Sequence, residues 1–519
     1  MTAHAERSHT AAHTTSALAL VVPFAVALSL FLWLGRAPLF DVDEGAFSEA
    51  TLEMFQRGDF LSTYLNGEPR YDKPILIYWL QAASVWLFGV SEFAFRLPSA
   101  LCASVWVALT FAFARRHFVT TPALLAAGIM GTSLGVYIIG RAATADALLN
   151  MLIAASMFAA WMYLESARRA WLDATFAAIG LGVLAKGPVA ILIPLAVTFV
   201  FCWLRRDLKL WLRTVFDLRA LLLFAVIAVP WYAIILYKEG SGFVQGFFIK
   251  HNVSRFSGPL QGHAGSLLYY IPVVLIGTLP FTACLVSVFA RLKRVWRDDL
   301  QCYLLLWFAF VFLFFSLSGT KLPHYILYGM SGMYILMAVY APSSRFWPLA
   351  PALLWFSFLL LLPSALEWTR PHVTDTYYRE AFADVRRQFG TAYYVYCAVA
   401  LAVTLGFTIE SRIQLSLKLT TIGALSVLAL SAFLVPIGAA IQQDPIKEAA
   451  LLARSRGWEV IMWRLNAPSF SVYYGQPTMS REPKAGDLVI TKAKRLSELQ
   501  GVQPEMLYAK NGIVLVRIH

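Results

Sequence analysis

The sequence predicts an all-α protein that crosses a membrane many times and ends in a small α/β domain. Of its 519 residues, 59% are hydrophobic and only 14% are charged. A soluble globular chain has no use for this much apolar surface. Long apolar stretches recur from residue 16 to residue 441, whereas short strand-like patterns are confined to 442–519.

Thirteen apolar stretches are long enough to cross the bilayer as helices. Most hold no internal charge and approach the ~20 residues that a crossing helix needs. The stretches are 16–34, 97–114, 119–140, 147–164, 171–185, 187–204, 220–237, 267–290, 300–318, 325–342, 346–366, 391–409 and 419–441. The first is too long for a cleavable signal peptide and lacks a small-x-small cleavage site before Arg36. Residues 1–15 are expected to be a disordered cytoplasmic terminus.

Charge predicts the orientation of these helices. With the N-terminus in the cytoplasm, the inner loops are short and basic, as the positive-inside rule demands. The loop 205–219 is an example, and it contains Arg205, Arg206, Lys209 and Arg213. The gap 35–96 instead carries nine carboxylates and five Lys or Arg residues, so it is expected to face outward.

The stretch 74–90 decides whether this orientation is self-consistent. It begins at Pro74, and prolines are tolerated at the start of a helix. It contains Tyr78, Trp79 and Trp86, and aromatic side chains settle at membrane interfaces. We expect a helix that lies on the outer face without crossing. A true span is the alternative, and it would reverse every later loop and break the charge rule.

Two regions are expected to stand outside the lipid. In the first outer loop, 35–96, residues 43–57 alternate acidic and apolar side chains and stop at Gly58, which predicts an amphipathic helix. The segment 442–519 predicts a helix near Pro445–Arg456. Strand-like runs follow it at 459–463, 470–474, 487–491 and 512–516. We interpret 16–441 as the membrane domain and 442–519 as an outer cap or substrate-guiding domain.

The remaining composition excludes other classes of protein. The net charge of +13 resides largely in the inner basic loops, which attract anionic lipid headgroups, so it indicates no nucleic-acid partner. All five cysteines fall within the expected spans, without metal-ligand spacing and away from outer loops where disulfides form. The sequence contains no G-x-S-x-G, no H-E-x-x-H and no phosphate-binding P-loop.

The expected topology gathers chemically active side chains at the outer face. They are Asp43, Glu44, Asp72, Lys73, Arg141, Asp146, Lys186, Lys250, His251, Arg255, Lys321, His324 and Tyr325. A lipid phosphate lies at this depth in the bilayer. Basic side chains there can bind the phosphate and stabilise it as a leaving group, and a carboxylate can accept the proton of an acceptor hydroxyl.

Several segments resemble one family in the same order along the chain. They are Asp43-Glu44, Arg70-Tyr71-Asp72-Lys73-Pro74, Arg141 to Asp146, Leu184-Ala-Lys-Gly-Pro188, Phe247 to Phe256, and Ser318-Gly-Thr-Lys-Leu-Pro-His-Tyr325. The chain resembles the lipid-phosphate-dependent glycosyltransferases of GT-C type. This family includes the protein O-mannosyltransferases and the bacterial aminoarabinose transferases that modify lipid A. The segment 442–519 is similar to the family's outer domain.

The resemblance implies roles for individual residues. The catalytic aspartate falls on Asp43, and Asp146 is a second catalytic candidate. The ligands of the lipid phosphate fall on Lys73 and Arg255, with Tyr325 and Lys321 beside them. Asp72 and His251 match a metal pair, which implies a divalent cation (Zn, Mg or Mn) and no nucleotide cofactor. Where the aminoarabinose transferases carry an Arg three residues after the aspartate, this chain has Ala46, so the sugar stays open.

Each candidate also has a structural interpretation. Asp43 and Asp146 can be helix caps. Lys73 and Lys186 can be cations that reach headgroups from the end of a span, and Arg255 can pair with a structural acid. His251, Lys321 and His324 can be packing residues, and Tyr325 can belong to an aromatic belt.

Taken together, these features predict an enzyme of the bacterial inner membrane with its active site and C-terminus on the periplasmic side. It would move a sugar from an undecaprenyl or other polyprenyl phosphate to lipid A, a glycan or a protein. The alternative is a transporter or flippase for a lipid-linked glycan. Transporters place ionisable groups mid-span in repeated, broken helices, and neither repeats nor mid-span charges are evident in this sequence.

Overall fold

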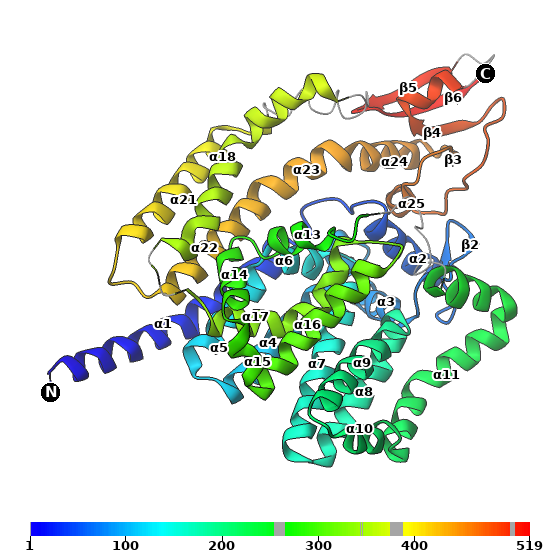
Figure 1. Ribbon diagram of the computed structural model, residues 1–519. Coiled ribbons are helices and arrows are strands. Elements are labelled where there is room, and N and C mark those ends of the chain that lie inside the picture. The colour runs from blue at the N-terminus through cyan, green and yellow to red at the C-terminus, as the bar shows by residue number, and fades with distance from the viewer. Residues whose placement is uncertain (1, 254–264, 343, 345, 374–387, 499–503) are drawn as a thin grey trace.

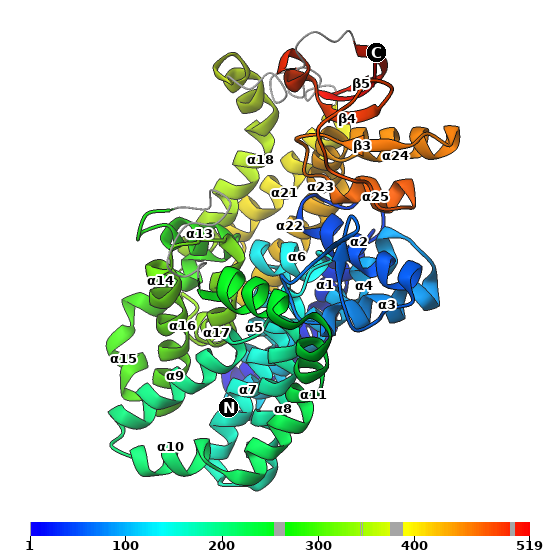
Figure 2. The same ribbon diagram turned by 90° about the vertical axis from the view of Figure 1, so that its right-hand side faces the viewer.

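The computed structural model describes residues 2–253, 265–342, 344, 346–373, 388–498 and 504–519, with backbone alone for 2–14 and 251–253. Helices build the body of the molecule, and a small sheet lies at one end of it, next to the C-terminus (Figure 1). The view turned by 90° shows the sheet and α24 above the helices of the first 120 residues (Figure 2).

Every expected membrane span falls on a helix or an interrupted helix. Seven helices among the described residues are long and apolar enough to cross a membrane, and the bent pair α5–α6 makes up to eight. The seven are α4 (Glu92–His117), α7 (Asp146–Ser166), α11 (Leu218–Phe243, continuing into the π-helix η1, Val244–Val253), α16 (Asp299–Leu317), α18 (Ala350–Thr369, flanked by the 3-10 turns η3, Trp347–Leu349, and η4, Arg370–His372), α21 (Thr391–Ile409) and α22 with its continuation (Leu415–Gln442).

The other expected spans are short or broken. They fall on α1 (Thr2–Phe31), α5–α6 (Thr120–Thr132 and Leu134–Arg141), α8 (Arg169–Lys186), α9 (Val189–Leu204), α13–α14 (Tyr270–Gly277 and Thr282–Ala290) and η2–α17 (Pro323–Gly329 and Met330–Val339). The α5–α6 pair bends by 61° at Ser133. The break between α13 and α14 contains Pro280, which has no backbone N–H to continue a helix. The count of thirteen spans and the disorder of 1–15 stay predictions, although α1 begins at Thr2.

The loop 35–96 has the two predicted helices. The amphipathic helix is α2 (Asp43–Arg57), and it ends at Gly58 in the left-handed conformation, with φ 64°. A two-stranded hairpin follows, formed by β1 (Tyr64–Leu65) and β2 (Glu68–Pro69). The expected interfacial stretch forms α3 (Leu76–Phe88), which at 13 residues is too short to cross a bilayer.

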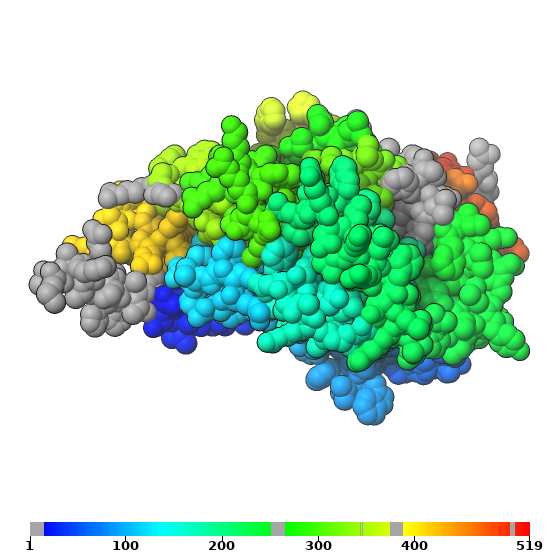
Figure 3. Space-filling view, turned by 60° about the horizontal axis from the view of Figure 1, so that its bottom comes forward, coloured from blue at the N-terminus to red at the C-terminus, as the bar shows by residue number. Residues whose placement is uncertain are grey.

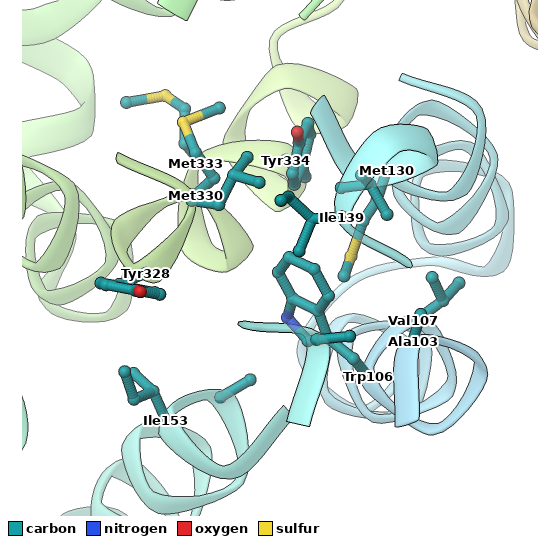
Figure 4. Packing of buried hydrophobic residues seen from close by; sticks show 14 of the residues in the cluster. Ala103, Trp106, Val107, Met130, Ile139, Ile153, Tyr328, Met330, Met333 and Tyr334 are labelled. Atoms are coloured by element: carbon teal, nitrogen blue, oxygen red, sulfur yellow. The ribbon is translucent and has the colours of Figure 1, made fainter. Parts of the chain in front are cut away.

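The main core lies where four long elements meet. Figure 4 shows Trp106 of α4 close to Met130 of α5 and Ile139 of α6, with Tyr334 of α17 on the other side of Ile139. The indole of Trp106 is fully buried, and its Nε1–H donates to the hydroxyl of Ser331 at 2.8 Å. The buried indole N–H therefore has a hydrogen-bond acceptor, as buried tryptophan N–H groups usually do. This core fixes the distance between the N-terminal helices and η2–α17.

The helix α11 packs on α8, and its side chains are mostly exposed. In Figure 3 the green surface of α11 and η1 stands out at the right-hand edge of the molecule. The short helices α10 (Leu208–Val215) and α15 (Leu292–Arg297) lie at the end of the bundle opposite the sheet (Figure 1).

The C-terminal segment combines helices with a four-stranded sheet of order β3-β4-β6-β5. Helix α23 (Val435–Gln442) leads through α24 (Asp444–Arg456) into β3 (Val460–Met462), and β3 pairs in parallel with β4 (Leu488–Lys492). The strands β6 (Ile513–Ile518) and β5 (Pro504–Lys510) add antiparallel pairs. The other elements here are the π-turn η5 (Leu430–Leu434), helix α25 (Pro468–Tyr474) and the 3-10 turn η6 (Ala493–Glu498).

Two details of the C-terminal prediction are wrong. The run 470–474 is helical: α25 starts with Pro468 at its first turn and ends at Gly475, with φ 91°. Its apolar side chains Phe470 and Tyr474 stack at a spacing of four residues, which suits a helix as well as a strand. The strand β5 was not predicted, because its residues are mostly exposed and carry no buried alternation.

Candidate functional site

Asp43 presents an exposed carboxylate at the start of α2, of which it is the first residue. The capping interpretation is wrong for this residue: the residue before the helix is Val42, and no side chain caps the helix start. Within the described part of the chain, the Asp43 carboxylate accepts no hydrogen bond, so it is available to a ligand.

The neighbouring Glu44 has the opposite character. Its carboxylate is buried and forms an ion pair with Arg96 of α4 at 2.7 Å. The backbone N–H groups of Phe40 and Ala143 also donate to it, each at 2.8 Å. Burial works to raise the pKa of Glu44, but Arg96 and these N–H groups outweigh it and lower the pKa below its usual value. Glu44 therefore stays ionised as a structural anion that ties α2 to α4.

The motif around Lys73 folds back against α2. Arg70 is buried, and its guanidinium donates to the carbonyl oxygen of Ala46 and lies 3.6 Å from the Asp72 carboxylate. Lys73 is partly exposed, and its Nζ donates to the carbonyl oxygen of Asp72 at 3.0 Å. The negative charge of Asp43 reaches Arg70 and helps to raise its pKa. The two sequence motifs of the first outer loop thus lie side by side.

Behind this loop lies a buried polar network centred on Asp146. The Nζ of Lys186 donates to Asp146 Oδ1 at 2.5 Å and to the hydroxyl of Tyr328 at 2.7 Å. The Tyr328 hydroxyl in turn donates to the same Oδ1 at 2.7 Å, and His324 Nε2 lies 3.5 Å from it. Asp146 does not cap α7 with its side chain, so the capping interpretation is wrong here too.

The segment 318–329 carries the remaining candidates that the structure describes. Tyr325 is buried, and its ring lies against His324 and under the ammonium group of Lys186, 5.4 Å from the ring centre. Lys321 is buried, and its Nζ donates to the carbonyl oxygen of Ser318 at 2.6 Å. Arg141 was also expected at this face, but its guanidinium binds the carbonyl oxygens of Ser29 and Leu32 at the end of α1.

His324 connects the two halves of the site. Burial lowers its pKa, and the charges of both Asp43 and Lys73 reach its imidazole. The Asp146 network therefore lies close enough to Asp43 and Lys73 for their charges to act on His324. Arg255 lies outside the described residues, as does the side chain of His251. Tyr328 is not among the predicted site residues, although its position three residues after Tyr325 in a 3-10 turn could have suggested it.

The described residues do not form a metal site by themselves. Among them, no group of three or more His, Cys, Asp or Glu side chains could hold a metal ion. Asp72 is near Arg70, which already offers it a positive charge.

A separate cavity of about 200 Å³ lies between α7, α8, α9, α10 and α11. Its lining includes Trp211, Cys202 and Phe224 and contains no charged residue. None of the predicted site residues lines it, so it is not the place where the charged chemistry occurs.

Comparisons with known proteins agree with this geometry. Residues 72–234 match the family model described as dolichyl-phosphate-mannose-protein mannosyltransferase. An uncharacterised protein of Aquifex aeolicus is 33% identical over 302 residues, which cover 58% of this chain and 68% of that one. The chain belongs to the GT-C family of lipid-phosphate-dependent glycosyltransferases.

Named members of this glycosyltransferase family are also similar. The undecaprenyl phosphate-alpha-4-amino-4-deoxy-L-arabinose arabinosyl transferase of Erwinia tasmaniensis is 32% identical over 331 residues, which cover 62% of this chain and 58% of that one. The match therefore spans little more than half of the length of that named transferase. The crystal structure of ArnT from Cupriavidus metallidurans bound to undecaprenyl phosphate has a TM-score of 0.81 at 20% identity, covering 97% and 98% of the two chains. This likeness establishes the GT-C fold.

Proposed function

We propose that this membrane glycosyltransferase moves a sugar from a polyprenyl phosphate carrier to an acceptor hydroxyl or phosphate. The observation that carries the proposal is an exposed carboxylate, Asp43, whose charge acts on Arg70 of the cationic Lys73 motif and, together with that of Lys73, on His324. The acceptor class is lipid A, a glycan or a protein.

The proposed reaction is a single displacement at the sugar's anomeric carbon. Asp43 accepts the proton of the acceptor hydroxyl as its oxygen forms the new bond to that carbon. The bond from the carbon to the phosphate oxygen breaks, and its electron pair leaves with the polyprenyl phosphate. Lys73 and Arg255 stabilise the charge that develops on this phosphate. Tyr325 and Lys321 are proposed as further phosphate contacts.

Asp146 stays a candidate catalytic residue, but its contacts favour a positioning role. A general base needs a free lone pair beside the acceptor proton. The Asp146 carboxylate already accepts from Lys186 and Tyr328 and neighbours His324. We propose that it holds η2 in place, so that Tyr325 keeps its position beside the phosphate.

The proposed divalent metal rests on Asp72 and His251 alone. Two side chains make an incomplete set of ligands for Zn or Mg, which bind four and six donors. The reaction above therefore uses no metal step. No role for a nucleotide cofactor is proposed.

The named relatives suggest the donor. We propose undecaprenyl phosphate as the carrier, because the Erwinia relative is named for that lipid. Ala46 replaces the Arg of the aminoarabinose transferases, so the sugar can differ from aminoarabinose. We further propose the bacterial inner membrane, with the site and the 442–519 domain on the periplasmic side and about thirteen spans in all.

The test is a transfer assay with the purified full-length protein and a polyprenyl-phosphate-linked sugar. Release of free polyprenyl phosphate with labelled acceptor supports the proposal. Movement of intact lipid across vesicles without bond cleavage would instead establish the flippase alternative. Mass spectrometry of lipid A and surface glycans from a deletion strain identifies the acceptor.

A further inference from the structure

Two hydrogen bonds next to Asp43 join the C-terminal domain to the loop that carries this residue. Asp41 precedes α2, and its Oδ1 accepts the backbone N–H of Ser469 at 2.9 Å. Its Oδ2 accepts a hydrogen bond from the Ser469 hydroxyl. Ser469 lies at the start of α25 and is 1% exposed. We call this pair of hydrogen bonds the Asp41–Ser469 clamp.

Gly45 has no side chain, and the clamp occupies the space where a side chain would lie. A Cβ atom on Gly45 would lie 2.2 Å from Asp41 Oδ1 and 2.5 Å from the backbone nitrogen of Ser469. Both distances are far inside van der Waals contact, and one of the two atoms is backbone. Glycine destabilises a helix relative to alanine. The close approach of the clamp therefore explains why α2 has a glycine at this position.

Further contacts continue the junction on both sides of the clamp. The Ser471 hydroxyl donates to Asn66 Oδ1 at 2.7 Å. The Tyr473 hydroxyl accepts the N–H of Leu39 at 2.7 Å, on the segment that leads to Asp41. Figures 1 and 2 both show α25 next to α2. The residues before and after Asp43 are therefore held by one helix of the C-terminal domain.

We propose that Asp41 is a positioning residue, which uses Ser469 of the C-terminal domain to hold the start of α2 and thereby aims Asp43 at the acceptor. The inference rests on the proposed function for the role of Asp43. On this proposal the C-terminal domain contributes to turnover, because α25 restrains the first turn of α2, which can move when the clamp is broken. Misplacement of a reacting group by about 1 Å can cost ~10²-fold in rate.

The protonation of Asp41 adds a second signature. Burial raises the pKa of Asp41 to about 7, against the effect of the Ser469 hydrogen bonds, and Glu44 adds to the rise. The other charged groups of the junction form pairs, Glu44 with Arg96 and Glu92 with Lys447. The Ser469 hydrogen bonds favour the ionised carboxylate, but burial outweighs them, so the closed junction around the clamp is most stable with neutral Asp41. It weakens as pH rises through about 7.

Three variants of the full-length protein test this positioning. Asp41→Asn keeps a side chain that can donate and accept hydrogen bonds, and it is neutral at every pH. Asp41→Leu removes the hydrogen bonds to Ser469. Gly45→Ala places a methyl group where the clamp lies and forces Asp41 and Ser469 apart. Gly438→Ala is the matched control, because Gly438 is a helical glycine with open space at its Cβ position. The readouts are kcat and KM for the lipid-linked sugar from pH 6 to 8.5, and hydrogen exchange of the Ser469 amide corrected for intrinsic exchange.

We expect Asp41→Leu and Gly45→Ala to lower kcat roughly 10–100-fold with KM changed less than about twofold, and to expose the Ser469 amide. Asp41→Asn should keep the wild-type rate at pH 6 and remove the loss of amide protection above pH 7. Wild-type kcat in Gly45→Ala, or a protected amide in Asp41→Leu, would overturn the proposal. If the wild type transfers no sugar, the proposed function fails, and the exchange data still decide whether the clamp exists.

Discussion

The ammonium group of Lys186 lies 2.5 Å from the carboxylate of Asp146, in a pocket closed by Tyr328. Both side chains are about 90% buried, so neither charge can be left without the other. Lys186 also lies over the ring of Tyr325. This pair joins α7, α8 and η2 beside His324, on which the charges of Asp43 and Lys73 act.

Breaking this pair should destabilise the protein, whereas removing both charges should not. Asp146→Asn or Lys186→Met alone is expected to cost about 3–5 kcal/mol of stability, because one buried charge stays uncompensated. The double variant should recover most of that stability in thermal unfolding in detergent. Recovered stability with recovered turnover means a positioning role for Asp146. Recovered stability with turnover still absent would make Asp146 catalytic.

Asp43→Asn should abolish turnover without harming the fold. Asp43 is exposed and caps nothing, so asparagine fits its place, while general-base help worth ~10²–10⁴-fold is lost. The adjacent Glu44→Gln is the contrasting variant: it breaks the buried pair with Arg96 and should lower the unfolding temperature. Near-normal turnover in Asp43→Asn would mean that another group accepts the proton.

Lys73→Ala and Arg255→Ala should each weaken use of the lipid-phosphate donor. Each removes a charge-assisted contact to the leaving phosphate, on the order of 2–4 kcal/mol in transition-state stabilisation. Lys73→Arg should retain only part of the wild-type activity with the lipid-phosphate donor, because a planar guanidinium does not replace a compact ammonium group. Lys209→Ala, at an exposed lysine of α10, serves as the control for lost positive charge. Unchanged kcat/KM in Lys73→Ala would show that this lysine only reaches headgroups.

Glu49→Gln should change the pH dependence of stability. Burial and the neighbouring Glu53 raise the pKa of Glu49 to about 9, well above its usual value. The folded state therefore favours the protonated acid, and its contribution is full below about pH 4.5 and declines as pH rises through 9. Glutamine keeps the neutral form, so the variant should unfold at a higher temperature than the wild type at pH 8–9. If the Tm of the wild type does not fall relative to that of Glu49→Gln between pH 8 and 9, the raised pKa of Glu49 is contradicted.

Single cysteines should report the orientation of the membrane domain. The five native cysteines are all buried, so their background reaction with a thiol reagent is low. Glu68→Cys and Lys484→Cys should react with a membrane-impermeant maleimide added to spheroplasts, whereas Lys209→Cys should react only after lysis. All three native residues are exposed. Labelling of Lys209→Cys from outside would reverse the proposed topology.

The sequence by itself determined the class of protein, the positions of its helices and the family. The length of an apolar stretch and the charges of the loops beside it are local properties of the sequence. They predicted helices at the expected spans and at 43–57, and the structure has a helix or an interrupted helix at each of these positions. The motifs around Asp43 and Lys73 were visible for the same reason: each lies within a few consecutive residues.

Only the tertiary structure decided which acid is exposed and which is buried in an ion pair. Asp43 and Glu44 are neighbours in sequence, but Arg96 neutralises Glu44 from another helix and leaves Asp43 exposed. Asp146 meets Lys186 and Tyr328 across three elements, and Asp41 meets Ser469 across 428 positions of the chain. Such contacts depend on packing between distant segments, and no local pattern of charge or hydrophobicity encodes them.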